Sequence, residues 1–110
     1  MRADYNKILM DLALKSPCRK KFGVIIIYRG QIVGKGFNYL VATMGKFTIH
    51  AEECAINSVR DKKILSKCQL ILARYCKEAG FVECRSCERC LRRIIQYGMR
   101  KITVYRGCSR

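Results

Sequence analysis

The sequence predicts an α/β fold whose helices and strands follow one another in the order α-β-β-α-β-α-β. Apolar residues recur at helical spacing in three stretches, which is typical of amphipathic helices. Runs of β-branched and apolar residues, each of strand length, lie between those stretches. Late in the chain the strands alternate with helices, which favours parallel pairing there and therefore a mixed sheet. A length of 110 residues fits one domain over residues 1–110.

Each predicted element has its own local pattern. Ser16-Pro17 ends the first helix, because proline disfavours a helical residue before it, and Gly98 supplies the stop of the last helix. The stretch "CKEAGFVE" contains Ala79-Gly80 and predicts a short hairpin arm. Helices are expected over residues 3–15, 49–59 and from Cys87 to Gly98, strands over residues 22–28, 32–39, 69–75 and 101–105, and a loop over residues 40–48.

The first two strands form a predicted hairpin. The run "FGVIIIY" is continuously apolar, which is typical of a strand buried on both faces. Gly30 lies in the tight turn "RGQ", and "IVGKGFNY" returns as the antiparallel partner. Gly34 and Gly36 interrupt this second strand. Glycine inside a strand indicates that another segment approaches the backbone closely.

The chain is strongly basic, with a net charge of +15 from 23 Lys and Arg against 8 Asp and Glu. This charge favours a polyanionic partner such as single-stranded nucleic acid, or a phosphorylated substrate, and a merely basic surface explains it equally well. No stretch reaches the 18 apolar residues of a membrane span. Acidic residues within "MRADYNKILMDLALKS" argue against a signal peptide. We therefore expect no membrane partner.

Eight cysteines are a high number for a chain of 110 residues. Cys54 and Cys68 fall inside apolar patterns, where a reduced thiol packs as a small hydrophobic group. Cys84, Cys87 and Cys90 instead follow one another at a spacing of three, which suits metal binding better than disulfide pairing. This usage predicts a reducing, cytoplasmic location.

A candidate metal site includes the only histidine of the chain, His50, in the stretch "FTIHAEECAI". Zinc binds imidazole nitrogen and thiolate sulfur, and a catalytic zinc has three protein ligands and a water. The spacing of Cys87 and Cys90 places both sulfurs on one face of a helix. With His50 they make a candidate catalytic zinc site. Glu52, two residues further on, is close enough to reach the water without binding the metal.

These motifs resemble a known family. His50-Ala51-Glu52, followed by Ser86-Cys87-x-x-Cys90, is similar to the H-x-E … P-C-x-x-C signature of the zinc-dependent nucleoside and nucleotide deaminases. "FGVIIIYRGQIVGKGFN" resembles the first hairpin of that family, and "CERCLRRIIQYGMRKITVY" resembles its metal-binding helix and the strand that follows. The resemblance covers nearly the whole chain. It implies a three-layer α/β/α, cytidine deaminase-like fold, a hydrolytic enzyme and one zinc ion per chain.

The resemblance also implies roles for individual residues. A zinc-activated water attacks the ring carbon that bears the amino group, a glutamate transfers the protons, and ammonia leaves. Ser86 stands where the family usually has proline, and we expect it to cap the following helix. Family members are commonly dimers or larger, which implies a homo-oligomer. The implied residues are His50, Cys87 and Cys90 for zinc, Glu52 for proton transfer, Asn38 for the sugar, Ala51 for the base edge, and Ser86 as a further substrate-binding position.

Several alternatives remain beside this interpretation. Four cysteines, Cys76, Cys84, Cys87 and Cys90, could close a structural zinc site, but that leaves His50 and Glu52 unexplained. As substrate we expect a cytosine nucleoside or nucleotide of the CMP or dCMP class. The alternative is a polynucleotide deaminase that acts on tRNA or single-stranded DNA. A non-catalytic zinc-stabilised module is a third hypothesis, which the intact Glu52 disfavours.

Overall fold

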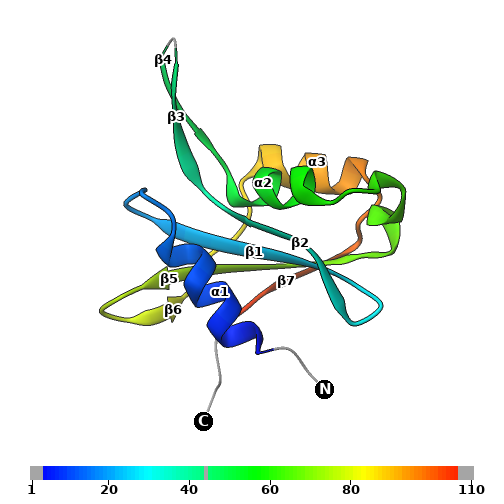
Figure 1. The fold of residues 1–110 in the computed structure, drawn as a ribbon, viewed down its shortest axis with the longest axis horizontal. Coiled ribbons are helices and arrows are strands. Elements are labelled where there is room, and N and C mark those ends of the chain that lie inside the picture. Colours follow the sequence, from blue (N-terminus) through cyan, green and yellow to red (C-terminus); the bar gives the residue numbers. More distant parts are fainter. Residues whose placement is uncertain (1–3, 44, 107–110) are drawn as a thin grey trace.

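The computed structural model describes residues 4–43 and 45–106, which form three layers (Figure 1). Helix α1 (Tyr5–Leu14) covers one face of a five-stranded sheet. Helices α2 (Ala51–Ser58) and α3 (Glu88–Gln96) cover the other face. The three predicted helices and the α/β/α architecture are thereby confirmed.

The sheet is mixed, as predicted. Strand β1 (Lys21–Tyr28) lies between β2 (Gln31–Phe37) and β5 (Gln69–Cys76) and is antiparallel to both. The other edge of β5 pairs with two short strands. Strand β6 (Gly80–Val82) is antiparallel to it, and β7 (Lys101–Val104) is parallel. The hairpin arm expected around Ala79-Gly80 is the β5–β6 hairpin, and the expected parallel pairing is that of β7.

The apolar run of β1 supplies both faces of the sheet. Val24 and Ile26 belong to the core under α2 and α3, whereas Ile25 and Ile27 belong to the core under α1. Side chains alternate between the two faces of a strand, so only a strand covered on both sides is apolar at every position. The continuous apolar pattern of β1 therefore indicates that helices cover both faces of the sheet.

The turn between β1 and β2 has the backbone that the hairpin requires. Arg29 and Gly30 have φ angles of 51° and 79°. Two consecutive residues with positive φ are the hallmark of the type I′ turn, whose twist matches that of the strands it joins. Gly30 adopts this conformation without steric cost.

Two elements differ from the prediction. A loop was expected over residues 40–48, but β3 (Tyr39–Thr43) and β4 (Gly45–Ile49) pair as antiparallel strands that project from the body of the molecule (Figure 1), with residue 44 outside the described residues. The stretch lacks the Asn-Gly or Asp-Gly turn that usually reveals a hairpin in a sequence. A 3-10 helix, η1 (Lys62–Lys67), connects α2 to β5, and Asp61 caps its start. Among the helices of the described residues, none has the length and hydropathy that crossing a membrane requires.

Helix α2 lies directly on the backbone of β2, as the two glycines of that strand predicted. A Cβ atom at Gly36 would lie 2.6 Å from the backbone oxygen of Ala51 and closer still to the backbone nitrogen of Ala55. At Gly34 it would lie 2.9 Å from the Ala55 oxygen. Contacts under 3.0 Å with backbone atoms cannot be relieved by a side-chain rotation. Glycine at these positions therefore sets the depth at which α2 sits.

We predict that Gly36→Ala lowers the free energy of unfolding by about 3 kcal/mol, because the added methyl group overpacks a contact between two backbones. It should also lower zinc content, because displacement of α2 moves His50 at its start. Gly30→Ala is the control. Because alanine is strained at the positive φ of this position, the variant should lose about 1 to 2 kcal/mol of the free energy of unfolding. No atom lies within 4 Å of the added Cβ, so zinc content should be unchanged. Equal zinc content in the two variants would contradict this account.

Candidate active site

The first turns of α2 and α3 bring together three potential metal ligands. His50 is the N-cap of α2 and Cys87 is the N-cap of α3. The Nδ1 atom of His50 lies 3.1 Å from Cys90 Sγ and 3.4 Å from Cys87 Sγ. All three ligand atoms lie within 4.8 Å of one another. Two segments 37 positions apart in the sequence thus meet at one point.

The spacing of these atoms fits a tetrahedral zinc ion. With Zn–N near 2.0 Å and Zn–S near 2.3 Å, a tetrahedron separates nitrogen from sulfur by about 3.5 Å. The two observed N–S distances are slightly shorter than this. One imidazole and two thiols also leave the fourth position open, as in a catalytic site. The donor set and its geometry therefore suit zinc.

The environment of Cys90 favours a bound cation. Cys90 is 1 % exposed. Burial raises the pKa of its thiol far above the ordinary value, and the neighbouring carboxylate of Glu52 raises it further. A metal dication acts in the opposite direction, because a coordinating thiol loses its proton to the metal. Metal binding should therefore release protons from this site.

Glu52 lies beside the three candidate ligands and is almost fully buried, at 5 % exposure. Its Oε2 atom accepts a hydrogen bond of 2.7 Å from Ser86 Oγ. The expectation that Ser86 caps α3 is wrong. Cys87 is the N-cap, and its Sγ accepts from the backbone N–H of Cys90 at 3.4 Å. The hydroxyl of Ser86 contacts the carboxylate instead.

The four-cysteine alternative does not match the geometry. Within residues 4–43 and 45–106, the group whose ligand atoms converge consists of His50, Cys87 and Cys90, without Cys76 or Cys84. The Cys76 thiol donates to Glu78 Oε1 at 3.0 Å in the β5–β6 hairpin. Burial and the charge of Glu52 raise the pKa of the Cys84 thiol.

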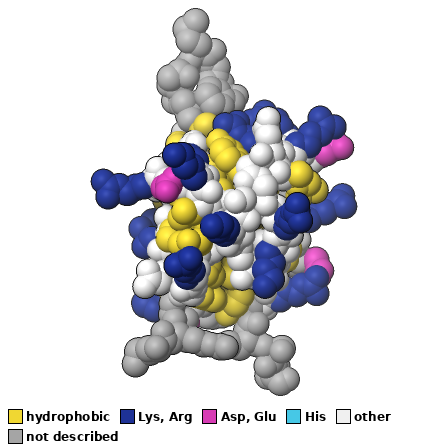
Figure 2. All heavy atoms as spheres, turned by 90° about the vertical axis from the view of Figure 1, so that its right-hand side faces the viewer, with side chains coloured by type: hydrophobic (Ala, Val, Ile, Leu, Met, Phe, Trp, Pro, Cys, Tyr) yellow, Lys and Arg dark blue, Asp and Glu magenta, His cyan; other side chains and the backbone are white. Residues whose placement is uncertain are grey.

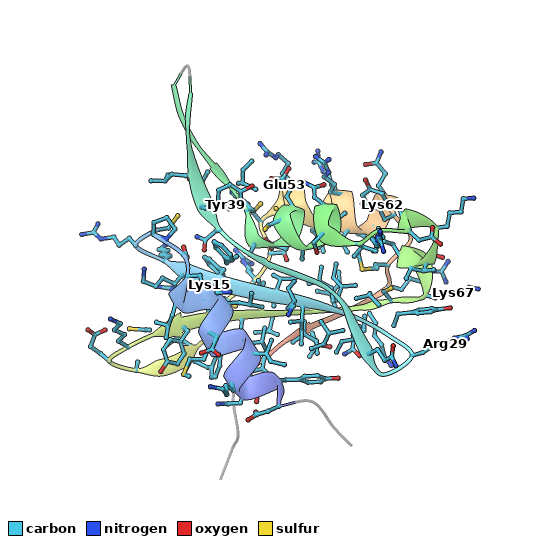
Figure 3. The ribbon with its side chains drawn as sticks, in the orientation of Figure 1. Lys15, Arg29, Tyr39, Glu53, Lys62 and Lys67 are labelled. Atoms are coloured by element: carbon cyan, nitrogen blue, oxygen red, sulfur yellow. The ribbon has the colours of Figure 1, made fainter. Side chains whose placement is uncertain are left out.

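Glu53 connects the two ligand-bearing helices. Its carboxylate lies 3.2 Å from Arg93 Nη1 and 3.5 Å from Arg89 Nη2, both on α3. Its side chain is only 13 % exposed, and Figure 3 places it in the helical layer, above the sheet. Glu53 is thus not a freely solvated residue. Its ion pairs hold α2 against α3 close to the candidate metal ligands.

A cavity of about 280 Å³ opens beside the candidate ligands. This is near the lower end of the range of small-molecule sites, roughly 300 to 1,000 Å³. Five positions that the sequence indicated line it: Asn38, His50, Ala51, Glu52 and Cys87. The other lining residues were not anticipated and are Cys18, Lys20, Phe22, Thr48 and Arg85.

Asn38 explains why the segment around residues 18–22 reaches the cavity. Its side-chain amide donates to the backbone oxygen of Lys20 at 2.7 Å, and its Oδ1 accepts from the backbone N–H of Phe22 at 2.9 Å. Asn38 is buried, at 7 % exposure. It therefore fixes the start of β1 at the wall of the cavity. No signal in the sequence linked Lys20 to the site, because the contact joins residues 18 positions apart.

Comparison with known proteins gives a family match and similar folds. A model of the cytidine and deoxycytidylate deaminase zinc-binding region matches residues 3–106. A dCMP deaminase of cyanophage S-TIM5, solved in complex with dCMP and dUMP, is similar with a TM-score of 0.63 and 21 % identity, over 94 % of this chain and 81 % of that one. The cytidine deaminase of Mycobacterium tuberculosis is similar with a TM-score of 0.61 and 16 % identity, over 96 % of this chain and 86 % of that one. A comparison with curated proteins found no match.

A larger enzyme shares the fold as one part of its chain. The diaminohydroxyphosphoribosylaminopyrimidine deaminase and 5-amino-6-(5-phosphoribosylamino)uracil reductase of Thermotoga maritima is similar with a TM-score of 0.60 and 24 % identity. The match covers 91 % of this chain and 28 % of that one. At identities below 25 %, these likenesses establish the shared fold.

We predict that the purified protein holds one zinc ion per chain and that Cys87→Ala loses it, because two remaining ligands bind weakly. Cys84→Ala is the matched control, since it removes a neighbouring thiol that does not belong to the converging group. Metal analysis by mass spectrometry after purification without chelator measures both. Zinc loss in Cys84→Ala with retention in Cys87→Ala would show that the ligands are assigned incorrectly.

Proposed function

The chain belongs to the cytidine and deoxycytidylate deaminase zinc-binding family, which it matches over residues 3–106, and we propose that its substrate is a cytosine nucleotide of the CMP or dCMP class. As a member, it is a zinc-dependent hydrolytic deaminase. One observation supports the proposal above the others. A buried carboxylate, Glu52, lines the same cavity as His50 and Cys87, and two cations stand in the wall of that cavity.

In the proposed reaction, Glu52 transfers protons between water and the base. Zinc, when bound by His50, Cys87 and Cys90, makes water a nucleophile at neutral pH. Glu52 takes a proton from the attacking water as its oxygen bonds to C4 of cytosine, and delivers that proton to the ring nitrogen. The proton that remains on the added oxygen goes to the amino group as that oxygen becomes a carbonyl, and the bond between the amino nitrogen and C4 breaks. The products are ammonia and the uracil form.

Two further residues orient the base and the sugar in this proposal. Ala51 is the first residue of α2, where the backbone N–H has no acceptor within the helix and can donate to the base edge. The side-chain amide of Asn38 donates one hydrogen to the backbone oxygen of Lys20 and accepts one hydrogen bond from the backbone N–H of Phe22. An amide has two hydrogens and two lone pairs, so one of each remains for a sugar hydroxyl.

The cations of the cavity support a phosphorylated substrate. Lys20 and Arg85 both line it and are exposed, so their charged groups can meet a phosphate in water. Arg74 of β5 is not among the lining residues. The cyanophage relative was solved with dCMP and dUMP, and binding of such ligands here is consistent with the two cations.

The alternative substrate is a polynucleotide. Its support is the net charge of +15 and a hollow of about 300 Å³ whose lining includes Arg29, Lys67, Arg100 and Lys101. Figure 2 shows this end of the molecule with Lys and Arg side chains spread over it. The labelled Arg29 and Lys67 lie at one end of the molecule, away from the labelled Glu53 in the first turn of α2 (Figure 3). We therefore rank the mononucleotide first.

A panel of cytosine and adenine nucleosides, nucleotides and oligonucleotides, assayed for released ammonia, tests the proposal. We expect release from CMP or dCMP. Polynucleotide deamination would instead fall steeply with added salt, because phosphate contacts release counterions. A homo-oligomer and a cytoplasmic location, predicted from the sequence, remain predictions.

We predict that Glu52→Gln lowers kcat by at least about 10³-fold, because glutamine cannot accept the water proton and general acid–base catalysis contributes about 10²–10⁴-fold. Zinc content should be unchanged, because no ligand is removed. The alternative is that Glu52 only stabilises the start of α2, in which case the variant loses about 1 kcal/mol of stability or less and keeps its turnover. Ammonia release, zinc content and Tm of the same variant separate the two cases.

We predict that Arg85→Gln lowers kcat/KM for CMP by about 10- to 100-fold, as expected for the loss of a charged hydrogen bond, and leaves kcat/KM for cytidine nearly unchanged. Arg74→Gln is the matched control and should affect neither substrate. The proposal of a phosphate site fails if the unsubstituted protein deaminates cytidine and CMP with equal efficiency.

A further inference from the structure

Ser86 contacts the carboxylate of Glu52 from behind the cavity. The two side chains are 34 positions apart in the sequence and are joined by the 2.7 Å hydrogen bond from Ser86 Oγ to Glu52 Oε2. Glu52 lines the substrate cavity, whereas Ser86 lines a different hollow, next to Ile102 and Val104 of β7. Ser86 therefore reaches the reaction through Glu52.

The hydrogen bond fixes the orientation of a long side chain. A glutamate has three rotatable bonds, and a catalytic group must be held close to its productive geometry. Because Ser86 engages Oε2, the second carboxylate oxygen remains for the substrate side. The position of Ser86 is itself constrained, since the next residue, Cys87, caps α3 and belongs to the candidate metal group.

A hydroxyl also suits a carboxylate that gains and loses a proton. Serine can donate one hydrogen bond and accept others. It can donate to Oε2 of Glu52 whether or not the other carboxylate oxygen, on the substrate side, carries a proton. A buried polar group that loses its partner is costly, and at 5 % exposure Glu52 has little access to bulk water. Ser86 can thus keep Glu52 hydrogen-bonded at both stages of proton transfer.

We propose that Ser86 is a positioning residue for deamination, which holds the Glu52 carboxylate in its productive orientation throughout the proton transfers. The proposal rests on the proposed function of Glu52. It assigns to Ser86 an effect on the chemical step, and none on substrate affinity or on metal binding.

Kinetics of Ser86 variants test this role. Ser86→Ala should lower kcat by about 10- to 100-fold, the usual effect of removing a partner that orients a group at a metal site, while KM and zinc content stay nearly unchanged. Ser86→Thr keeps the hydroxyl and should restore most of kcat. Ser58→Ala is the matched control. Its hydroxyl donates to Ala55 O and accepts from Lys35 N–H, remote from the cavity lining, so kcat should not change.

Three outcomes would overturn the proposal: an unchanged kcat in Ser86→Ala, a loss that Ser86→Thr does not restore, or a loss of zinc that accounts for the lost activity. A thermal double-mutant cycle gives a readout that needs no turnover. Ser86→Ala should lower Tm in the unsubstituted protein but not in the Glu52→Ala variant, where the hydroxyl has no carboxylate partner. Equal Tm shifts in both backgrounds would contradict the pairing. If the Tm values show coupling between Ser86 and Glu52 but no substrate is deaminated, the proposed function is wrong, whereas the contact between the two side chains is confirmed.

Discussion

The candidate site depends on the contact between the backbone of β2 and the first turns of α2. Gly36 has no side chain, so Ala51 and Ala55 lie directly on the strand. Any larger residue would push α2 away from the sheet. Since His50 and Glu52 occupy the start of this helix, the contact sets how deeply both functional groups lie. The buried position of Glu52 follows from it.

Two sets of side-chain contacts then complete the arrangement. Glu53 pairs with Arg89 and with Arg93, which lies in the last turn of α3, and these ion pairs join α2 to the helix that carries Cys90. Asn38 binds the backbone of Lys20 and Phe22 and holds the start of β1 in the lining of the cavity. Packing, ion pairs and hydrogen bonds thus each position a different part of the site.

Local patterns in the sequence predicted the fold and the metal group. Each of the successful predictions rests on one short stretch of sequence. These stretches are the apolar run of β1, the glycines of β2 and the C-x-x-C spacing. The hydrogen bonds of Asn38 and Ser86, and with them the approach of Lys20 to the cavity, join distant segments, and no local pattern encodes them. The capping role expected of Ser86 was wrong for this reason, because a partner on another helix uses its hydroxyl. Arg85 lies only two positions before Cys87, so its approach follows from the motif itself.

Buried negative charge gives the site its electrostatic character. Glu52 and the thiol of Cys90 lie close together with almost no access to water, an arrangement that is unfavourable for two anions and favourable around a dication. We therefore regard the metal as the group that completes the electrostatics of this region, with the open fourth position available for chemistry.

X-ray absorption at the zinc K edge of the purified protein tests this central claim most directly. We predict a first coordination shell of two sulfur atoms, one nitrogen and one oxygen, the last from the open position. A shell of four protein ligands, such as four sulfur atoms or three sulfur atoms and one nitrogen, would contradict the claim, because it would identify a closed structural site.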